Sequence, residues 1–401
     1  MKLIYVLEFL GLISIFQYFY VTVPRFRYLN SSVSLMVHKH SKLRDVLRKL
    51  MRRMCRAVLR AVAKTAPDGN ELLPDLGAAK RVLLVLVNYR MGNTVLATPA
   101  VSALIDALPM AKISFVGGPY APGILKGYNL QHVYTVSRRD SWMPLRLLRL
   151  IRTLRQEHYD IAIHLSMASA SLGAFIMYAS GAKHRIGCRG SVGNIFFTSA
   201  MEHPRSLHKV DQINEYTRWL GIHTSGERKL ALSNEERCWA ERFFGERIHN
   251  SCGRPIGIFV GSRQRKGKSW DISNFGVVVK GLRSHGFPVV VFIGHEEASR
   301  EELIRASLGQ ALYIKEPDVR RVAALVSGCR VVFTPDSGPM HLSVAVGTKT
   351  VALFVKPNFD RYGPRQPQGE VVFDPHGTSA DRALQTILKL CNQTCAASST
   401  M

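Results

Sequence analysis

Residues 330–364 of this 401-residue chain read RVVFTPDSGPMHLSVAVGTKTVALFVKPNFDRYGP, and this stretch indicates the fold most strongly. Its first residues form a short apolar run, which is typical of a strand buried on both faces of a parallel sheet. A tight PDSG turn follows, and Pro339 stands where the first turn of a helix accepts a proline. A second apolar run, TVALFV, predicts the next strand. The stretch therefore reads strand, helix, strand, the unit of a doubly wound α/β sheet.

The same alternation of strands and helices occurs in two halves of the chain. The strands predicted in the first half are RVLLVLVN, KISFVGG, HVYTVS, YDIAIHLS and HRIGC. Those in the second half are PIGIFVGS, PVVVFIGH, ALYIK, RVVFTP and TVALFV. We therefore predict two Rossmann-like domains that face a cleft, with ligands bound beyond the carboxyl ends of the strands. The predicted boundaries are a linker at 65–80, domains at 81–225 and 226–390, and a tail at 391–401.

The first 64 residues differ from the rest and predict a membrane-associating leader. Residues 3–23 are almost continuously apolar and long enough to span a bilayer, although Glu8 and Gln17 also allow a helix that lies in the interface. Residues 41–64 place apolar side chains at helical spacing beneath a basic surface, which is typical of a helix on anionic headgroups. The alternative for this second segment is a helix packed on the protein with a solvated basic face. If 3–23 spans, the basic excess after it places the body in the cytoplasm.

Composition narrows the classes of partner and cofactor. The 54 Lys and Arg against 29 Asp and Glu give a formal charge of +25, which attracts the phosphates of nucleic acid, anionic lipid or a phosphorylated glycan alike. The sequence has no DNA or RNA motif and no basic stretch interleaved with aromatics. A nucleic-acid-binding protein is therefore an alternative that only the net charge supports. The seven cysteines form no CxxC pair and no zinc-type spacing, which favours free thiols in a reducing compartment. No cofactor is expected.

The PDSG turn is a candidate phosphate site. The backbone N–H groups at a helix start, with the positive end of the helix dipole, form a cradle for a diphosphate. Gly338 lets a ligand approach the backbone closely, and His341 can donate a hydrogen bond to a phosphate oxygen. Asp336 either caps the helix or accepts a hydroxyl of the ligand. The alternative is an ordinary strand-to-helix turn with an Asp or Ser cap.

At these residues the sequence resembles a known family. The run DSGPMHLSVAVGTKTVALF at 336–354, followed by RYGP, is similar to the signature of glycosyltransferase family 9, the heptosyltransferases of lipopolysaccharide core assembly. GSRQRKGKSWDISNFGVVVKGL at 261–282 is similar to the family's segment with a lysine two residues before a tryptophan. GHEEASREEL at 294–303 is similar to its acidic turn. MGNTVLATPAVSAL at 91–104 matches its opening motif except at one position. The resemblance covers roughly residues 81–390.

The resemblance implies a GT-B architecture and inverting transfer without a metal. It implies transfer of a heptose, or a related sugar, from a nucleotide-sugar donor, ADP-heptose first, to an anionic, lipid-linked glycan of the lipopolysaccharide type. The enzyme would work at the cytoplasmic face of a bacterial inner membrane, as a peripheral or single-span protein. No DxD motif or metal-ligand spacing appears in the sequence, which agrees with a metal-free reaction.

The resemblance also implies a donor site in the second domain and an acceptor site in the first. Lys268 would lie against the donor phosphates, and Glu296 or Glu297 would hold the ribose. Three further bases in the same loop are potential helpers: Arg263, Arg265 and Lys266. The rest of the implied donor site is Asp336, Ser337, Gly338, Pro339, Met340 and His341. The loop GSRQRKGKS resembles a P-loop, but five residues rather than four separate its glycines, which argues against an NTPase.

Asn93 occupies the position of the family's expected catalytic base. A neutral amide orients a hydroxyl but cannot accept its proton. Three hypotheses follow: His164 serves as the base, the proton leaves late to water or to the departing diphosphate, or the protein binds a sugar nucleotide without transferring it. Gly92 and Arg90 complete the implied acceptor side. Arg90 contacts an acidic acceptor or, alternatively, forms a salt bridge.

Overall fold

The computed structural model describes residues 71–140, 143–166, 171–189, 196–204, 206–224, 227, 229–248, 253–261 and 270–398. The predicted leader and the loop that holds Lys268 lie outside the described residues. The described chain forms two compact units. Unit 1 holds the described residues up to Val87, with Leu108–Val116 and Leu130–His203. Unit 2 holds Asn88–Ala107, Gly117–Asn129 and the described residues from Pro204 onward.

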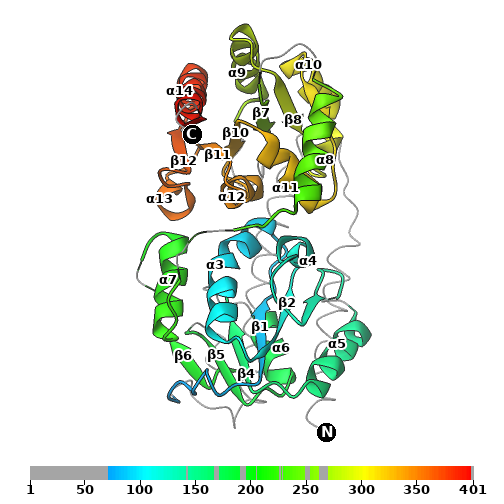
Figure 1. Ribbon diagram of the computed structural model, residues 1–401, viewed down its shortest axis with the longest axis vertical. Helices are drawn as coiled ribbons and strands as arrows, with labels where there is room; N and C mark the ends of the chain where they lie inside the picture. The colour runs from blue at the N-terminus through cyan, green and yellow to red at the C-terminus, as the bar shows by residue number, and fades with distance from the viewer. Residues whose placement is uncertain are drawn as a thin grey trace, which may run out of the picture. The chain divides into compact units, whose positions relative to one another are not determined.

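Unit 1 is built on a six-stranded sheet with the order β3-β2-β1-β4-β5-β6 (Figure 1). Its strands are β1 (Arg81–Leu86), β2 (Lys112–Gly117), β3 (His132–Thr135), β4 (Ile161–His164), β5 (His184–Cys188) and β6 (Ser199–Met201). Strand β1 pairs with β4 in parallel, with Val82 opposite Ile161. Helix α6 (Ser171–Ala179) packs on β1 and β4, and α5 (Pro144–Gln156) packs beside α6. Burial of β1 on both faces explains its continuous apolar run.

Unit 2 is built on a second six-stranded parallel sheet, with the order β12-β11-β10-β7-β8-β9. Its strands are β7 (Ile256–Phe259), β8 (Val289–Phe292), β9 (Leu312–Ile314), β10 (Val331–Pro335), β11 (Lys349–Phe354) and β12 (Gly369–Phe373). Its helices are α3 (Met91–Ala107), α4 (Ala121–Ile124), α7 (Lys209–Trp219), α8 (Asn234–Gly245), α9 (Ile272–Ser284), η4 (Ala298–Arg300), α10 (Glu301–Leu308), α11 (Val319–Gly328), α12 (Gly338–Ala345), α13 (Phe359–Tyr362) and α14 (Ala380–Ser398).

Both sheets have the same connectivity. Counted within each unit, the strand order is 3-2-1-4-5-6, the order of a Rossmann fold. The prediction of two doubly wound units is therefore confirmed. In unit 2 the order reverses between β7 and β10, and open sheets bind ligands beyond the strand ends at such a point. The two strands lead there to Gly261 and to Asp336, which directs attention to these loops.

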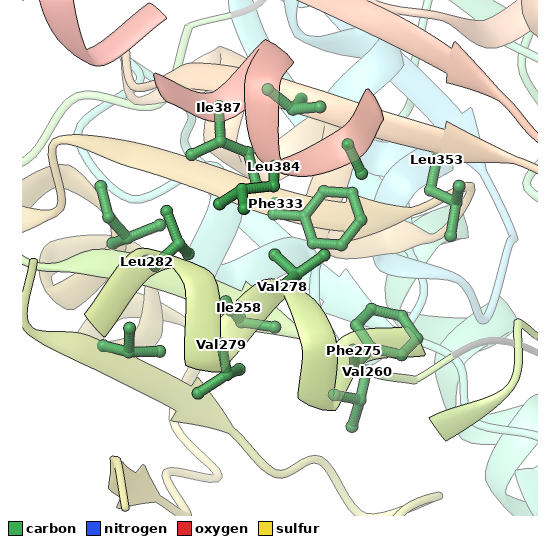
Figure 2. Packing of buried hydrophobic residues seen from close by; sticks show 14 of the residues in the cluster. Ile258, Val260, Phe275, Val278, Val279, Leu282, Phe333, Leu353, Leu384 and Ile387 are labelled. Carbon is green, nitrogen blue, oxygen red and sulfur yellow. The ribbon is translucent and has the colours of Figure 1, made fainter. Parts of the chain in front are cut away.

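The core of unit 2 holds these loops in place. Helices α9 and α14 pack on one face of the sheet, and their buried side chains interdigitate with those of the strands (Figure 2). Val278 of α9 and Leu384 of α14 lie beside Phe333, which is the middle residue of β10 and is fully buried. The strand that ends at the PDSG turn is therefore rigidly packed on this face.

The sequence did not predict two strands, β6 and β12. Strand β6 has only three residues, and β12 is a partly buried edge strand that begins with Gly369 and Glu370. Neither has the continuous apolar run of strands such as β1, β7 and β10. No helix in the described part of the chain is long and apolar enough to cross a bilayer.

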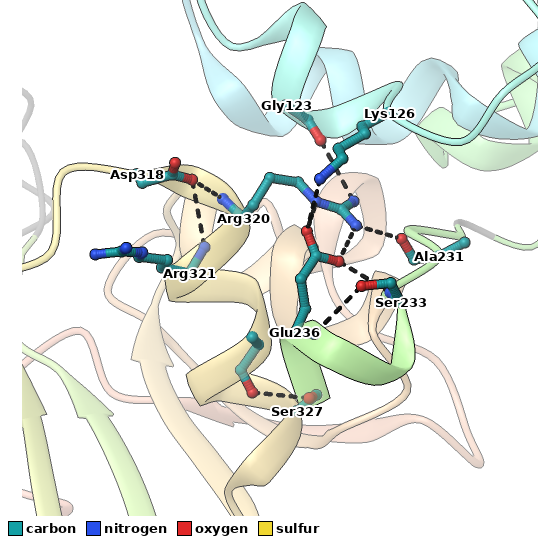
Figure 3. A network of polar contacts seen from close by, with 10 residues as sticks. Gly123, Lys126, Ala231, Ser233, Glu236, Asp318, Arg320, Arg321 and Ser327 are labelled. Carbon is teal, nitrogen blue, oxygen red and sulfur yellow. Dashed lines mark hydrogen bonds and ion pairs between the residues drawn. The ribbon is translucent and has the colours of Figure 1, made fainter. Parts of the chain in front are cut away.

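A buried ion pair joins α8 and α11 in unit 2 (Figure 3). The Arg320 guanidinium donates two hydrogen bonds to the Glu236 carboxylate, one of them from Nε to Oε1 at 2.9 Å. It also donates to the carbonyl oxygens of Ala231 and Gly123. Glu236 accepts from the Ser233 N–H at 2.9 Å and closes a capping box at the start of α8. The bonds from Arg320 lower the pKa of Glu236 to about 2. The network fixes α8 against α11, which leads into β10.

We expect Phe333→Ala to lower the free energy of unfolding by about 3–5 kcal/mol, because it leaves a cavity that the packed helices cannot fill. Urea unfolding followed by tryptophan fluorescence measures this, since Trp270 lies 5.9 Å from Phe333, ring centroid to centroid. Leu303 of α10 is 53% exposed, so Leu303→Ala is the control and should change the free energy by less than about 0.5 kcal/mol. A loss below about 1 kcal/mol for Phe333→Ala would contradict this account of the core.

We expect Glu236→Gln to lower the free energy of unfolding by about 2–3 kcal/mol at neutral pH, because it leaves the Arg320 charge buried without its partner. The folded-state pKa is depressed, so the carboxylate stabilises the fold fully above its ordinary pKa of 4.5, and this contribution is lost as the pH falls towards 2. The difference between the two chains should therefore shrink between about pH 5 and pH 3. Glu302→Gln, at an exposed position of α10, is the control. A difference that stays constant over this range argues against the ion pair.

Candidate functional site

Helix α12 begins without a side-chain cap. Ser337 is its N-cap residue and is extended, with φ −149° and ψ 176°, but its side chain makes no capping hydrogen bond. The Ser337 hydroxyl lies instead 3.2 Å from the Thr334 hydroxyl. Pro339 lies in the first turn, as predicted. The alternative of a Ser-capped turn is therefore wrong, whereas a capping role of Asp336 stays a prediction. The Ser337 side chain thus accepts from none of the backbone N–H groups at this helix start, which makes them candidate donors to a ligand.

Asp336 is held by a residue that sequence reasoning missed. The Asn358 Nδ2 donates to the Asp336 Oδ2 at 2.9 Å, and the Asp336 N–H donates to the Leu353 carbonyl at 3.0 Å. The Oδ1 atom of Asn358 is buried and has no hydrogen-bond partner among the described residues. The signal was present in the sequence: Asn358 is a polar residue shortly after β11, which pairs with β10. It fixes the orientation of the carboxylate at the PDSG turn.

The start of α3 meets the start of α12 in unit 2. Gly92 is buried, and a Cβ added to it would lie only 2.7 Å from Cδ2 of His341. A Cβ added to Gly338 would lie 3.1 Å from Cε of Met91. A side chain at Gly92 would therefore displace the His341 ring or the backbone, whereas one at Gly338 would press on the flexible end of Met91. His341 itself is 6% exposed. The structure thus brings together Gly92, predicted on the acceptor side, and Gly338 and His341, predicted on the donor side.

The other residues predicted on the acceptor side lie in the same turn. Asn93 is half-buried and its N–H donates to the Arg90 carbonyl at 3.2 Å. Arg90 is exposed, and its N–H donates to the Asn88 Oδ1 at 3.0 Å. These bonds shape the turn between β1 and α3.

The two predicted ribose-binding glutamates differ in their surroundings. Glu296 is exposed, whereas Glu297 is half-buried and its Oε2 accepts from the Gly294 N–H at 3.1 Å. A Cβ on Gly261 would lie 2.2 Å from the Glu297 Oε1, so this carboxylate lies against the end of β7. Burial, and then the charge of Glu296, raise the pKa of Glu297. Of the two, Glu297 is the one that lies at the strand ends.

The predicted donor loop, with Lys268, Arg263, Arg265 and Lys266, lies outside the described residues. Trp270, the first described residue after it, is held by several contacts. The Trp270 Nε1 donates to the Asp374 Oδ2 at 2.7 Å, and the indole packs edge-on against Phe275. Asp374 also accepts from the N–H groups of residues 377–379. These hydrogen bonds lower the pKa of Asp374 against the opposing effect of burial, which is the largest single influence.

His164, the alternative base, lies at the end of β4 in unit 1 and is buried. Burial lowers its pKa to about 4, partly offset by a hydrogen bond with Ser166. Its ring lies 5.6 Å from that of Phe197, and a Cβ on Gly173 would lie 2.7 Å from its Nε2. The imidazole is therefore neutral at pH 7 and a weak proton acceptor. Its role as a base stays a prediction. Within the described ranges, no group of three or more His, Cys, Asp or Glu side chains is placed to hold a metal ion.

A family model described as glycosyltransferase family 9 (heptosyltransferase) matches residues 147–391, more than half of the chain. The chain belongs to glycosyltransferase family 9. It is thus a glycosyltransferase, and the resemblance found in the sequence is confirmed. The matched residues include Glu297 and the Asp336–His341 segment, whereas the turn that holds Asn93 lies before them.

Relatives and solved structures agree with this membership. The chain is 21% identical over 311 residues to the lipopolysaccharide core heptosyltransferase OpsX of Haemophilus influenzae, an alignment that covers 75% of this chain and 86% of the relative. It is 25% identical over 236 residues to lipopolysaccharide heptosyltransferase 2 of Escherichia coli K12, covering 55% of this chain and 64% of the relative's length.

Two solved structures have a similar fold. A glycosyltransferase family 9 protein from Veillonella parvula has a TM-score of 0.68 at 19% identity, covering 82% of this chain and 99% of that one. ADP-heptose lipopolysaccharide heptosyltransferase II of E. coli has a TM-score of 0.65 at 19% identity, covering 78% and 98%. The predicted GT-B fold, an α/β fold with two Rossmann-like sheets, is confirmed.

We expect Gly92→Ala to lower kcat/KM of this family 9 glycosyltransferase by about tenfold or more, because the new methyl group would displace the His341 ring or the start of α3. Release of nucleotide diphosphate measures the rate, and circular dichroism confirms the fold. Gly245→Ala is the matched control, because no atom lies within 4 Å of the Cβ it would add. An unchanged rate in Gly92→Ala would show that this contact has no part in the reaction.

Proposed function

We propose that this chain transfers a heptose, or a related sugar, from ADP-heptose to an anionic, lipid-linked glycan of the lipopolysaccharide type. The observation that carries the proposal is the uncapped start of α12 beside His341 and Gly92, at the switch point of the unit 2 sheet. The names of the relatives support the class of sugar and acceptor, since they are lipopolysaccharide heptosyltransferases. The choice of donor is supported by the E. coli protein of similar fold, which is named as an ADP-heptose heptosyltransferase.

The proposed donor site surrounds the diphosphate. Its oxygens accept hydrogen bonds from the N–H groups of Gly338 and Met340, at the positive end of the α12 dipole. His341 and Lys268 add donors as the negative charge of the leaving diphosphate develops, so no metal is required in this mechanism. These groups act most strongly in the transition state, where that charge is largest.

Two carboxylates complete the donor site in this proposal. Glu297, at the end of β7, accepts hydrogen bonds from the ribose hydroxyls, and the more exposed Glu296 stands beside it. Asp336 accepts a hydroxyl of the transferred sugar. The hydrogen bond from Asn358 keeps the Asp336 carboxylate in one orientation for that task.

The acceptor side is proposed at the start of α3. Asn93 orients the attacking hydroxyl through a hydrogen bond, with Gly92 beside it, and Arg90 contacts an acidic group of the acceptor. The acceptor oxygen forms its bond to the anomeric carbon from the face opposite the breaking bond to the diphosphate, so the configuration inverts. Because His164 is buried and its Nε2 is enclosed by the protein, the hydroxyl proton in this mechanism leaves late, to water or to the departing diphosphate.

The proposed placement in the cell follows from the leader and the acceptor. Residues 3–23 and 41–64 hold the chain, by a span or at the interface, at the cytoplasmic face of the bacterial inner membrane. Residues 81–225 form the acceptor domain and 226–390 the donor domain in this proposal. A second candidate is a sugar-nucleotide-binding protein of the same fold that transfers no sugar. It is favoured because Asn93, an amide, stands where the resemblance implies the catalytic base.

The test of the proposed function is release of nucleotide diphosphate by the detergent-solubilised full chain. ADP-heptose and a panel of other sugar nucleotides are supplied with and without truncated lipid-linked core acceptors. We expect acceptor-dependent release, and His341→Ala should lower kcat by about 10²-fold or more through loss of a donor to the leaving group. Donor binding without release from any pair would instead support the binding-protein candidate.

The pH–rate profile tests the role of Asn93. An amide does not titrate, so the unsubstituted chain should show no decline in kcat/KM near the pKa of an aspartate, about 4. Asn93→Asp should acquire such a decline on the acid side, and Asn93→Ala should lower kcat/KM by roughly tenfold at every pH through loss of one hydrogen bond. A carboxylate-like decline already present in the unsubstituted chain would show that another residue is the base.

A further inference from the structure

Helix α5 of unit 1 has two opposite faces of different character. Its inner face carries Leu147, Ile151 and Leu154, which are buried. Its outer face is a stripe of exposed residues at helical spacing, named here the α5 stripe: Leu145, Arg149, Arg152 and Gln156. The inner face accounts for the packing of α5 on the protein. The stripe has no part in that packing.

The cations of the α5 stripe are not neutralised within the described chain. Helix α5 contains four arginines and no acidic residue. Among the described residues, no carboxylate forms an ion pair with Arg149 or Arg152. The other two arginines of α5 do have partners within the protein. Arg146 pairs with Asp140 at 3.2 Å, and Arg155 donates to the Ala179 carbonyl at 2.8 Å. The two outermost arginines therefore present an uncompensated positive charge to solvent.

Large apolar side chains are exposed at the same place. Leu145 is 68% exposed, and Met143, just before the helix, is 44% exposed. Cations with interleaved apolar groups are typical of helices that bind anionic bilayers. Helix α5 has no aromatic residue on which a nucleic-acid base could stack, which favours lipid over nucleic acid.

We propose that the α5 stripe, with Met143, docks unit 1 on an anionic lipid surface. Arg149 and Arg152 contact headgroup phosphates while Leu145 and Met143 enter the apolar layer below them. The contact is separate from the leader at 1–64 and adds a second attachment that fixes the orientation of unit 1. This inference rests on the proposed function in one respect: a lipid-linked acceptor gives the enzyme a reason to bind a membrane surface.

Vesicle flotation of the full chain tests the charge of the α5 stripe. We expect the double substitution Arg149→Glu with Arg152→Glu to weaken partition onto vesicles of phosphatidylcholine with phosphatidylglycerol by roughly tenfold or more. Arg149→Lys with Arg152→Lys should retain it. The matched control is Lys280→Glu with Arg283→Glu, which reverses two exposed charges at the same spacing on α9. An equal loss in the control pair, or no loss in the α5 pair, would overturn the proposal.

Flotation cannot report on α5 if the leader alone brings all of the protein to the vesicles. Fluorescence quenching of a tryptophan placed on α5 tests the contact in that case. Leu145→Trp is placed in the full chain with anionic vesicles whose acyl chains are brominated, and its quenching is compared with that of the unsubstituted chain. We expect added quenching, which the two α5 glutamate substitutions should abolish. Leu303→Trp, at an exposed leucine of α10 in unit 2, is the control and should add none. Equal quenching at both positions, or none at Leu145→Trp, would contradict docking through α5.

The two proposals fail in different ways. Diphosphate release with a short, soluble acceptor should be unchanged by the α5 substitutions, because the α5 stripe lies outside the proposed donor and acceptor residues. Lost release with unchanged vesicle binding would contradict the docking role of α5. Absence of release in the unsubstituted chain would contradict the proposed function and leave the vesicle result to stand by itself. Loss of oligonucleotide binding, with vesicle binding kept, would identify a nucleic acid as the partner and overturn the proposal.

Discussion

The hydrogen-bonding requirement of the start of α12 is the constraint on which the rest of the site depends. A helix start leaves backbone N–H groups that need acceptors, and Ser337 does not supply one because its hydroxyl lies against Thr334. The strand before this turn cannot shift to relieve the need, since β10 pairs with β7 and β11 and is buried on both faces. In the proposed mechanism these N–H groups form a preorganised anion site at the switch point of the second sheet.

The close approach of α3 and α12 gives this anion site its second side. Gly92 and Gly338 have no side chains, so the two helix starts meet and His341 lies against Gly92. A site for a sugar between a leaving diphosphate and an attacking hydroxyl requires such proximity, because orientation of the two reactants accounts for a large part of rate acceleration. Membership of glycosyltransferase family 9 establishes the class of reaction. Asn93, at the position where the resemblance implies a carboxylate base, makes the fate of the hydroxyl proton the distinctive feature of the proposed mechanism.

Much of the fold and part of the site could be predicted from the sequence, for physical reasons that differ by element. Strands buried on both faces, such as β1, β7 and β10, are continuous apolar runs and were recognised, whereas the edge strand β12 and the three-residue β6 lack that signal. Pro339 marked the start of α12 because the first turn of a helix is where a proline is most readily accepted. The bond between Asn358 and Asp336 joins residues 22 apart, and it can be inferred from the sequence only once β11 is known to pair with β10.

A crystal structure of the full chain with ADP bound tests the central claim most directly. The account predicts that oxygens of the diphosphate accept hydrogen bonds from the N–H groups of Gly338 and Met340, with the His341 ring beside them and the ribose near Glu297. A diphosphate bound elsewhere, or one held only by side chains of the 262–269 loop while the start of α12 contacts no ligand, would contradict it.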